Sequence, residues 1–192
     1  MDSFPAIEID KVKAWDFRLA NINTSECLNV AYGVDANYLD GVGVSITSIV
    51  LNNRHINLDF YIIADVYNDG FFQKIAKLAE QNQLRITLYR INTDKLQCLP
   101  CTQVWSRAMY FRLFAFQLLG LTLDRLLYLD ADVVCKGDIS QLLHLGLNGA
   151  VAAVVKDVEP MQEKAVSRLS DPELLGQYFN SGVVYLDLKK WA

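Results

Sequence analysis

The chain has 192 residues, a length that suits one domain, or one domain with a short appendage. Hydrophobic residues make up 52% of it and charged residues 21%, so it can fill a sizeable core and is not a disordered tail. The net charge of -4 argues against a nucleic-acid-binding protein that is held by its overall electric field.

The first 26 residues show no clean hydrophobic period. We interpret residues 1–26 as an N-terminal extension with a short helix around residues 9–17. No basic segment followed by an apolar one stands at the start, so a secretory signal is not expected. No stretch reaches the roughly 18 uninterrupted apolar residues of a membrane span. The expected location is therefore the cytosol, where the four cysteines would be reduced thiols.

From residue 27 onward, strand patterns alternate with helix patterns. Runs rich in Val, Ile and Leu predict strands at residues 28–34, 58–66, 84–91, 125–134, 150–155 and 182–186. Apolar residues at helical spacing predict helices at residues 42–51, 68–82, 105–120 and 138–146, the last of them capped by Asp138. This alternation indicates an α/β domain over residues 27–192, with a mostly parallel central sheet covered by helices on both faces.

Parallel sheets of this kind bind ligands at the carboxyl ends of their strands. Aspartates stand at or just after several predicted strand ends and are therefore candidates to face a ligand: Asp35, Asp65, Asp130, Asp132 and Asp157. We expect the ligand site at this edge of the sheet.

Asp130 and Asp132 are separated only by Ala131, at the end of an apolar run. In an extended segment, residues i and i+2 point to the same side, so the two carboxylates can converge while Ala131 turns away. Two such carboxylates repel each other unless a cation lies between them, and oxygen ligands suit Mg²⁺ or Mn²⁺. The tripeptide is weak evidence by itself, and a pair of solvated acids at a strand end is the alternative.

Other phosphate-binding patterns are missing from the sequence. It contains no GxxxxGK[ST] loop, and the GxG of residues 41–43 lacks the third glycine of the dinucleotide fingerprint. A redox domain of Rossmann type is therefore the least favoured interpretation. Phosphates would have to be held by a metal ion and by side chains such as Arg112 or Lys136.

The cysteine pattern CLPC spans Cys98 to Cys101. A redox pair normally follows a strand and opens a helix, and a structural zinc site needs a second pair of ligands. Neither His55 nor His144 has a ligand-like neighbour. We therefore interpret the segment as a loop with two ordinary thiols.

Four segments resemble the family 8 glycosyltransferases in order and spacing: AYGVDANY (31–38), SRAMYFRL (106–113), LYLDADVV (127–134) and FNSGVVYLDLKKW (179–191). The resemblance implies a GT-A fold, which is Rossmann-like, and a retaining, metal-dependent transfer from a UDP-sugar. Within the family the chain is most similar to the bacterial enzymes that add hexoses to the lipopolysaccharide outer core. That similarity implies UDP-glucose as the donor, with UDP-galactose as the alternative, and a core hexose as the acceptor. Peripheral association with the cytoplasmic face of the inner membrane would follow.

The resemblance also implies roles for individual residues. The first motif would hold uracil and ribose through Gly33, Val34, Asp35, Ala36, Asn37 and Tyr38, with Asp35 accepting a hydrogen bond from the uracil imide. The other implied contacts with the UDP-sugar are made by Arg112, by Asp130, Ala131 and Asp132, and by Asn180 and Ser181. Asp130 and Asp132 would ligate Mg²⁺ or Mn²⁺, and Asp157 is a candidate for the acid near the transferred sugar.

Structural alternatives stand beside three of these roles. Asp35 could form a turn after a strand, Arg112 a salt bridge on a helix, and Asn180 with Ser181 a plain turn. The aromatic stripe from Phe111 to Phe116 is expected to belong to the core.

Family members carry two further motifs, Asp-Gln-Asp and His-x-x-Gly-x-x-Lys-Pro-Trp, and the sequence reaches Ala192 without either. We expect the chain to correspond to the donor-binding part, with the acceptor-side part absent. Two hypotheses follow: a glucosyltransferase or galactosyltransferase of this family, and a fragment that binds a UDP-sugar without transferring it.

Overall fold

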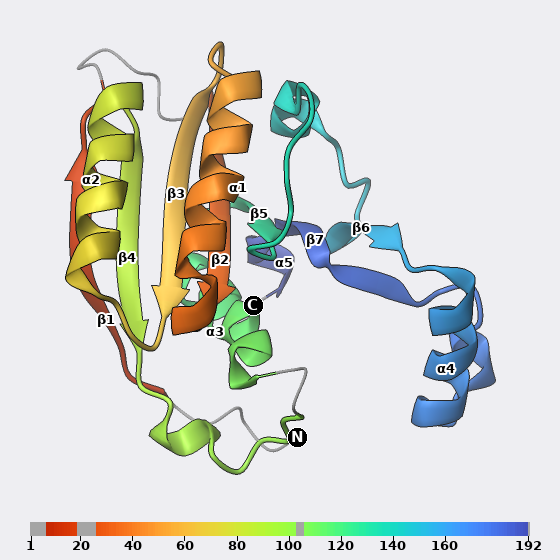
Figure 1. The fold of residues 1–192 in the computed structure, drawn as a ribbon. Coiled ribbons are helices and arrows are strands. Elements are labelled where there is room, and N and C mark those ends of the chain that lie inside the picture. Colours follow the sequence, from red (N-terminus) through yellow and green to blue (C-terminus); the bar gives the residue numbers. More distant parts are fainter. Residues whose placement is uncertain (1–6, 19–25, 103–105, 192) are drawn as a thin grey trace.

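The computed structural model of the chain describes residues 7–18, 26–102 and 106–191, which contain a seven-stranded sheet flanked by helices (Figure 1). The strand order is β1-β4-β3-β2-β5-β7-β6. The strands are β1 Ile9–Asp16, β2 Cys27–Val34, β3 Asn57–Ala64, β4 Arg85–Ile91, β5 Arg125–Leu129, β6 Ala152–Lys156 and β7 Phe179–Asp187. β4, β3, β2 and β5 are parallel neighbours, whereas β1 and β7 run antiparallel to their partners. The predicted α/β class with a mostly parallel sheet is confirmed.

Helices cover both faces of this sheet. The α-helices are α1 Leu39–Asn52, α2 Asp69–Asn82, α3 Phe111–Leu119, α4 Glu159–Leu169 and α5 Leu188–Trp191. The 3-10 helices are η2 Ala36–Tyr38, η3 Asp94–Leu96, η4 Arg107–Tyr110, η5 Ser140–His144 and η6 Pro172–Leu174. The apolar residues of α1 and α2 pack on one face, and those of α3 and α5 pack on the other.

The central strands are buried on both sides. In β2, Val30 and Tyr32 belong to the core under α1 and α2, while Ala31 between them belongs to the core under α3. Successive side chains of a strand point to opposite faces, so a strand covered twice needs apolar residues at every position. This is the physical reason for the continuous apolar runs in the sequence.

The N-terminal segment is a strand, and the helix predicted around residues 9–17 is wrong. β1 pairs antiparallel with β4, and the register shifts between Lys11 and Lys13. Val12 and Trp15 pack on the core under α1 and α2, and Ile9 packs on the core under α3, so partly buried residues recur at every third position. A β-bulge inserts one extra residue and breaks the period of two. The resulting spacing imitates that of a helix.

Two predicted helices differ in extent or type. The helix predicted at residues 105–120 begins as α3 only at Phe111, since Arg107–Tyr110 form η4, and residues 103–105 lie outside the described ranges. The helix predicted at residues 138–146 is the 3-10 helix η5. Asp138 accepts the N–H of Ser140 in a local turn at 2.8 Å and does not cap an α-helix.

Helix α4 lies in a polar segment where no helix was predicted. Among its residues only Gln162 and Ala165 are buried, so the segment lacks an apolar stripe that periodicity could detect. Helix α2 begins with a side-chain cap, because the side chain of Asn68 accepts the N–H of Phe71 at 2.8 Å.

The aromatic stripe of α3 is a core element, as expected. Phe111, Phe114 and Phe116 are all buried against the sheet. Across the described ranges, none of the helices combines the length and the apolar character that crossing a membrane requires.

Candidate functional site

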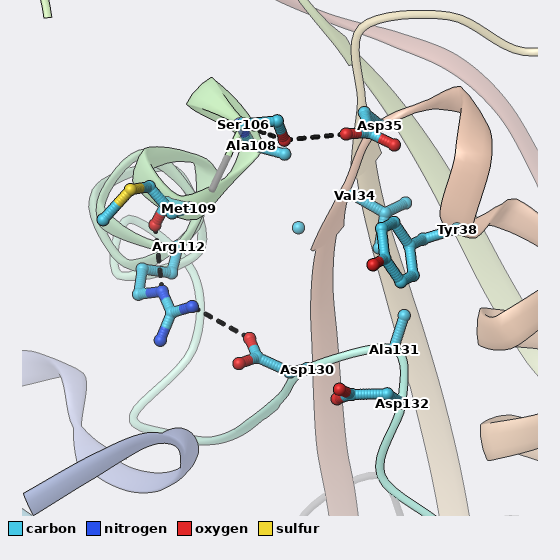
Figure 2. A pocket seen from close by; sticks show the side chains of 11 residues that line it. Val34, Asp35, Tyr38, Ser106, Ala108, Met109, Arg112, Asp130, Ala131 and Asp132 are labelled. Carbon is cyan, nitrogen blue, oxygen red and sulfur yellow. Dashed lines mark hydrogen bonds and ion pairs between the residues drawn. The ribbon is translucent and has the colours of Figure 1, made fainter. Parts of the chain in front are cut away.

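The candidate site lies where the carboxyl ends of β2 and β5 adjoin. These strands are parallel neighbours in the sheet, so the segments that follow them emerge at the same edge. A cavity of about 160 Å³ opens there (Figure 2). Its lining consists of Gly33, Val34, Asp35, Tyr38, Ser106, Ala108, Met109, Arg112, Asp130, Ala131 and Asp132. Two segments almost a hundred residues apart in the sequence thus meet at one cavity.

Asp35 forms one end of this cavity. Its Oδ1 accepts the backbone N–H of Asn37 at 3.0 Å, which begins the 3-10 helix η2. Its Oδ2 accepts the hydroxyl of Ser106 at 2.7 Å. Figure 2 shows this bond joining the end of β2 to the segment that leads into α3. Both oxygens of Asp35 are therefore already engaged by the protein.

The Asp-x-Asp pair forms the other end of the cavity, in a turn. β5 ends at Leu129, and the N–H of Val133 donates to the carbonyl of Asp130 at 3.2 Å. The expected extended geometry of this pair is therefore wrong, and so is the strand predicted to continue to residue 134. Both aspartates nevertheless line one cavity, because the turn carries them along the same side of it (Figure 2).

The expectation that Ala131 turns away from the two carboxylates and their site is wrong. It is buried, lines the cavity and lies against α1. Its carbonyl oxygen would be only 3.1 Å from a Cβ at Gly41. A glycine at that position of α1 therefore lets the helix approach the turn that carries the two aspartates.

Arg112 is held almost entirely by protein atoms. One terminal nitrogen, Nη2, is 2.9 Å from Asp130 Oδ1, and the other donates to the carbonyl of Ser181. Nε donates to the carbonyl of Met109 at 3.0 Å, and the guanidinium lies over the ring of Tyr128, 5.0 Å from its centroid. Only 15% of the side chain is exposed. The arrangement fixes the position of the Asp130 carboxylate.

The two carboxylates of the turn repel each other. Burial raises the pKa of Asp130, Arg112 opposes the rise, and the neighbouring Asp132 carboxylate adds to it. Within the described ranges, no three His, Cys, Asp or Glu residues gather closely enough to hold a metal ion. The available donors are thus two carboxylates beside an open cavity. That set fits Mg²⁺ or Mn²⁺, which typically take one or two protein carboxylates and complete their shell with water and phosphate oxygens.

The remaining predicted residues lie beside the cavity or away from it. Ala36 and Asn37 border an adjoining cavity. Asn180 and Ser181 stand at the start of β7 and do not line the first cavity, although the Ser181 carbonyl holds Arg112. Asp157 follows β6, where its Oδ1 accepts the N–H of Val158 at 2.8 Å, and it too is absent from the lining.

Sequence reasoning missed three residues of the lining, namely Ser106, Ala108 and Met109. Ser106 makes two side-chain hydrogen bonds. Its hydroxyl donates to Asp35 and accepts the N–H of Ala108 at the start of η4. The signal was present, because all three residues belong to the SRAMYFRL segment.

Comparisons with known proteins identify the family. The model of Glycosyl transferase family 8 matches residues 29–192. The chain is 40% identical over 185 residues to lipopolysaccharide 1,2-glucosyltransferase of Escherichia coli, which covers 96% of this chain and 53% of that protein. It is 36% identical over 180 residues to lipopolysaccharide 1,3-galactosyltransferase of Salmonella typhimurium, covering 92% of this chain and 53% of that protein.

The fold also has solved counterparts. A crystal structure of the galactosyltransferase LgtC with donor and acceptor sugar analogues superposes with a TM-score of 0.73 at 23% identity. The match covers 85% of this chain and 59% of that one, and at this identity it shows a shared fold. The chain spans about half the length of the two curated relatives.

Proposed function

The chain belongs to glycosyltransferase family 8, and we propose that it forms the donor-binding part of a hexosyltransferase that builds the bacterial lipopolysaccharide core. The observation that carries the proposal is the convergence of Asp35, Asp130 and Asp132 on one cavity at the carboxyl ends of β2 and β5. The cavity offers hydrogen-bonding groups at one end and two carboxylates at the other. A nucleoside diphosphate sugar has the matching order of base, ribose and charged diphosphate.

We propose UDP-glucose as the donor, because the glucosyltransferase relative has a higher identity than the galactosyltransferase relative. The uridine would enter beside Gly33, Val34, Asp35 and Tyr38, and the diphosphate would lie at the Asp-x-Asp turn. The acceptor would be a hexose of the lipopolysaccharide core, reached by peripheral association with the cytoplasmic face of the inner membrane.

In the proposed reaction, Asp130 and Asp132 would hold Mg²⁺ or Mn²⁺ against the diphosphate. The bound ion would supply charge neutralisation and Lewis acidity for the UDP leaving group. Arg112 keeps Asp130 in place and adds positive charge beside the same phosphates. An acceptor hydroxyl that attacks from the face where UDP departs would retain the α configuration of the sugar.

The test is calorimetric titration of UDP into this chain, with Mn²⁺ and then with a chelator. We expect binding that requires the metal and that Asp130→Asn abolishes. Asp10→Asn is the matched control, because Asp10 is exposed on the edge strand β1. UDP binding that is equally strong with chelator, or unchanged in Asp130→Asn, would contradict the assignment.

A second candidate is a module that binds the donor but transfers nothing. It is considered because the chain spans only about half the length of its curated relatives. Release of UDP from UDP-glucose, measured with a lipopolysaccharide core acceptor, separates the two candidates. Binding without such release would favour the module, and release would favour the transferase.

A further inference from the structure

β6 and β7 pair in two blocks that are out of step with each other. Val154 lies opposite Val184, but the next residue, Val155, lies opposite Asn180. Residues 181–183 of β7 therefore have no partner in β6 and form a bulge. Beyond this bulge, the outer ends of the two strands extend away from the body of the sheet, with α4 beside them (Figure 1).

The bulge supports the proposed metal site through two backbone carbonyls. The carbonyl of Ser181 accepts Arg112 Nη1 at 2.5 Å, and the carbonyl of Gly182 accepts the N–H of Asp130 at 2.9 Å. Arg112 in turn holds Asp130 Oδ1 at 2.9 Å. The backbone and the carboxylate of Asp130 therefore both depend on where the bulge lies.

Few apolar contacts hold the outer ends of the two strands. Val155 is 55% exposed, and Phe179 on the facing strand is 43% exposed. Helix α4 contributes only two buried side chains, those of Gln162 and Ala165. The register of a strand is strongly specified where one of its faces is buried, so this exposed pair needs another contact to fix its register.

Gln162 supplies that contact with three hydrogen bonds. Its Nε2 donates to the carbonyls of Asp157 and Tyr178, at 2.9 and 2.5 Å, and its Oε1 accepts the N–H of Tyr178 at 2.9 Å. Asp157 directly follows β6 and Tyr178 directly precedes β7, so one amide joins the outer ends of both strands. Only 3% of Gln162 is exposed, and both its N–H groups and its carbonyl are used inside the protein.

We propose that Gln162 is a positioning residue for the pair formed by Arg112 and Asp130. By locking the outer strand ends together it sets their register, and the register decides where residues 181–183 present their carbonyls to that pair. The inference rests on the proposed function in one respect, since it takes Asp130 as a ligand of the metal ion that holds the diphosphate. Gln162 does not line the candidate cavity, so it acts through the backbone.

The first test measures hydrogen exchange of the Asp130 N–H by NMR in the chain without ligand. Gln162→Met keeps the length of the side chain and removes all three of its hydrogen bonds. We expect the Asp130 amide to exchange about tenfold faster, on the scale of one lost hydrogen bond. Amides of the central strand β3 should keep their protection, which a general loss of stability would not allow.

The second test measures the dissociation constant of UDP in the presence of Mn²⁺. We expect Gln162→Met to weaken binding by about tenfold, because Asp130 is no longer held in place. The electron paramagnetic resonance spectrum of Mn²⁺ in the saturated complex should also change, since it reports the arrangement of the ligands around the ion. Glu163→Met is the matched control, because it places the same side chain at the next, exposed position of α4 and should alter none of these measurements.

A second variant covers the case in which Gln162→Met does not fold, as judged by a loss of protection throughout β3. Gln162→Glu still accepts the N–H of Tyr178, but its carboxylate has no hydrogen for the two carbonyls. We expect it to accelerate exchange of the Asp130 amide and to weaken UDP binding in the same way, and the same criteria then decide.

The outcomes separate the two proposals. Unchanged exchange of the Asp130 amide, or equal acceleration in Glu163→Met, would overturn the inference and leave the proposed function standing. Faster exchange with unchanged UDP affinity would also overturn it, because the site would then not depend on Gln162. Failure of the unmodified chain to bind UDP would overturn the proposed function, whereas exchange of the Asp130 amide would still decide whether Gln162 positions the pair.

Discussion

Gly182→Ala should disable the proposed metal site through a single added methyl group. A Cβ at this position of β7 would lie 2.9 Å from Asp130 Oδ2 and 3.0 Å from Asn180 Oδ1. Ordinary contacts begin at 3.4 Å, so the Asp130 carboxylate would have to retreat by about 0.5 Å. It cannot do so freely, because its other oxygen is held by Arg112 at 2.9 Å.

The expected magnitude follows from the cost of overpacking, typically about 1–3 kcal/mol. If that cost falls on the bound state, Mn²⁺-dependent UDP binding weakens by about 5- to 150-fold. Calorimetry measures the loss, and Gly137→Ala is the matched control, because a Cβ there would meet nothing within 4 Å. Unchanged binding by Gly182→Ala, or an equal loss in Gly137→Ala, would refute the argument that room for Asp130 is what this glycine provides.

Three further predictions concern protonation, reactivity and stability. Because burial raises the pKa of Asp130, protons should compete with Mn²⁺ at a higher pH than they would at an ordinary carboxyl group of pKa about 3.9. Mn²⁺ affinity, measured by calorimetry, should therefore fall as the pH is lowered, and an affinity that is flat down to pH 4 would contradict this. Burial, reinforced by Asp59, raises the pKa of Cys27 to about 12. Mass spectrometry at pH 8 should therefore show little alkylation of Cys27 while the exposed Cys98 and Cys101 react, and equal alkylation rates would contradict this prediction. Gly43 lies in α1, and the methyl group added by Gly43→Ala would meet no other atom within 4 Å. The substitution should stabilise the fold by about 0.5–1 kcal/mol, which is a rise in Tm of about 1–4 °C in scanning calorimetry. A lower Tm would contradict this prediction.

The sequence by itself predicted the core of the sheet, because local patterns record burial. β2, β3 and β4 were found within a few residues of their bounds, since a strand covered on both faces must be apolar throughout. The Asp-x-Asp pair was found for a similar reason, because charged residues that interrupt such a run need a partner. Four short segments sufficed to identify the family.

Geometry that depends on distant residues was decided only by the tertiary structure. Asp35 and Ser106 are separated by 71 positions and Arg112 and Ser181 by 69, so no local pattern reports either contact. The turn at Asp130 and the bulge of β1 had the same effect, since each breaks the period from which side-chain direction is inferred. The sequence determined which residues carry charge at the strand ends. Packing decided which of those charges meet, because only the folded chain brings α3, β7 and the strand ends to one edge of the sheet.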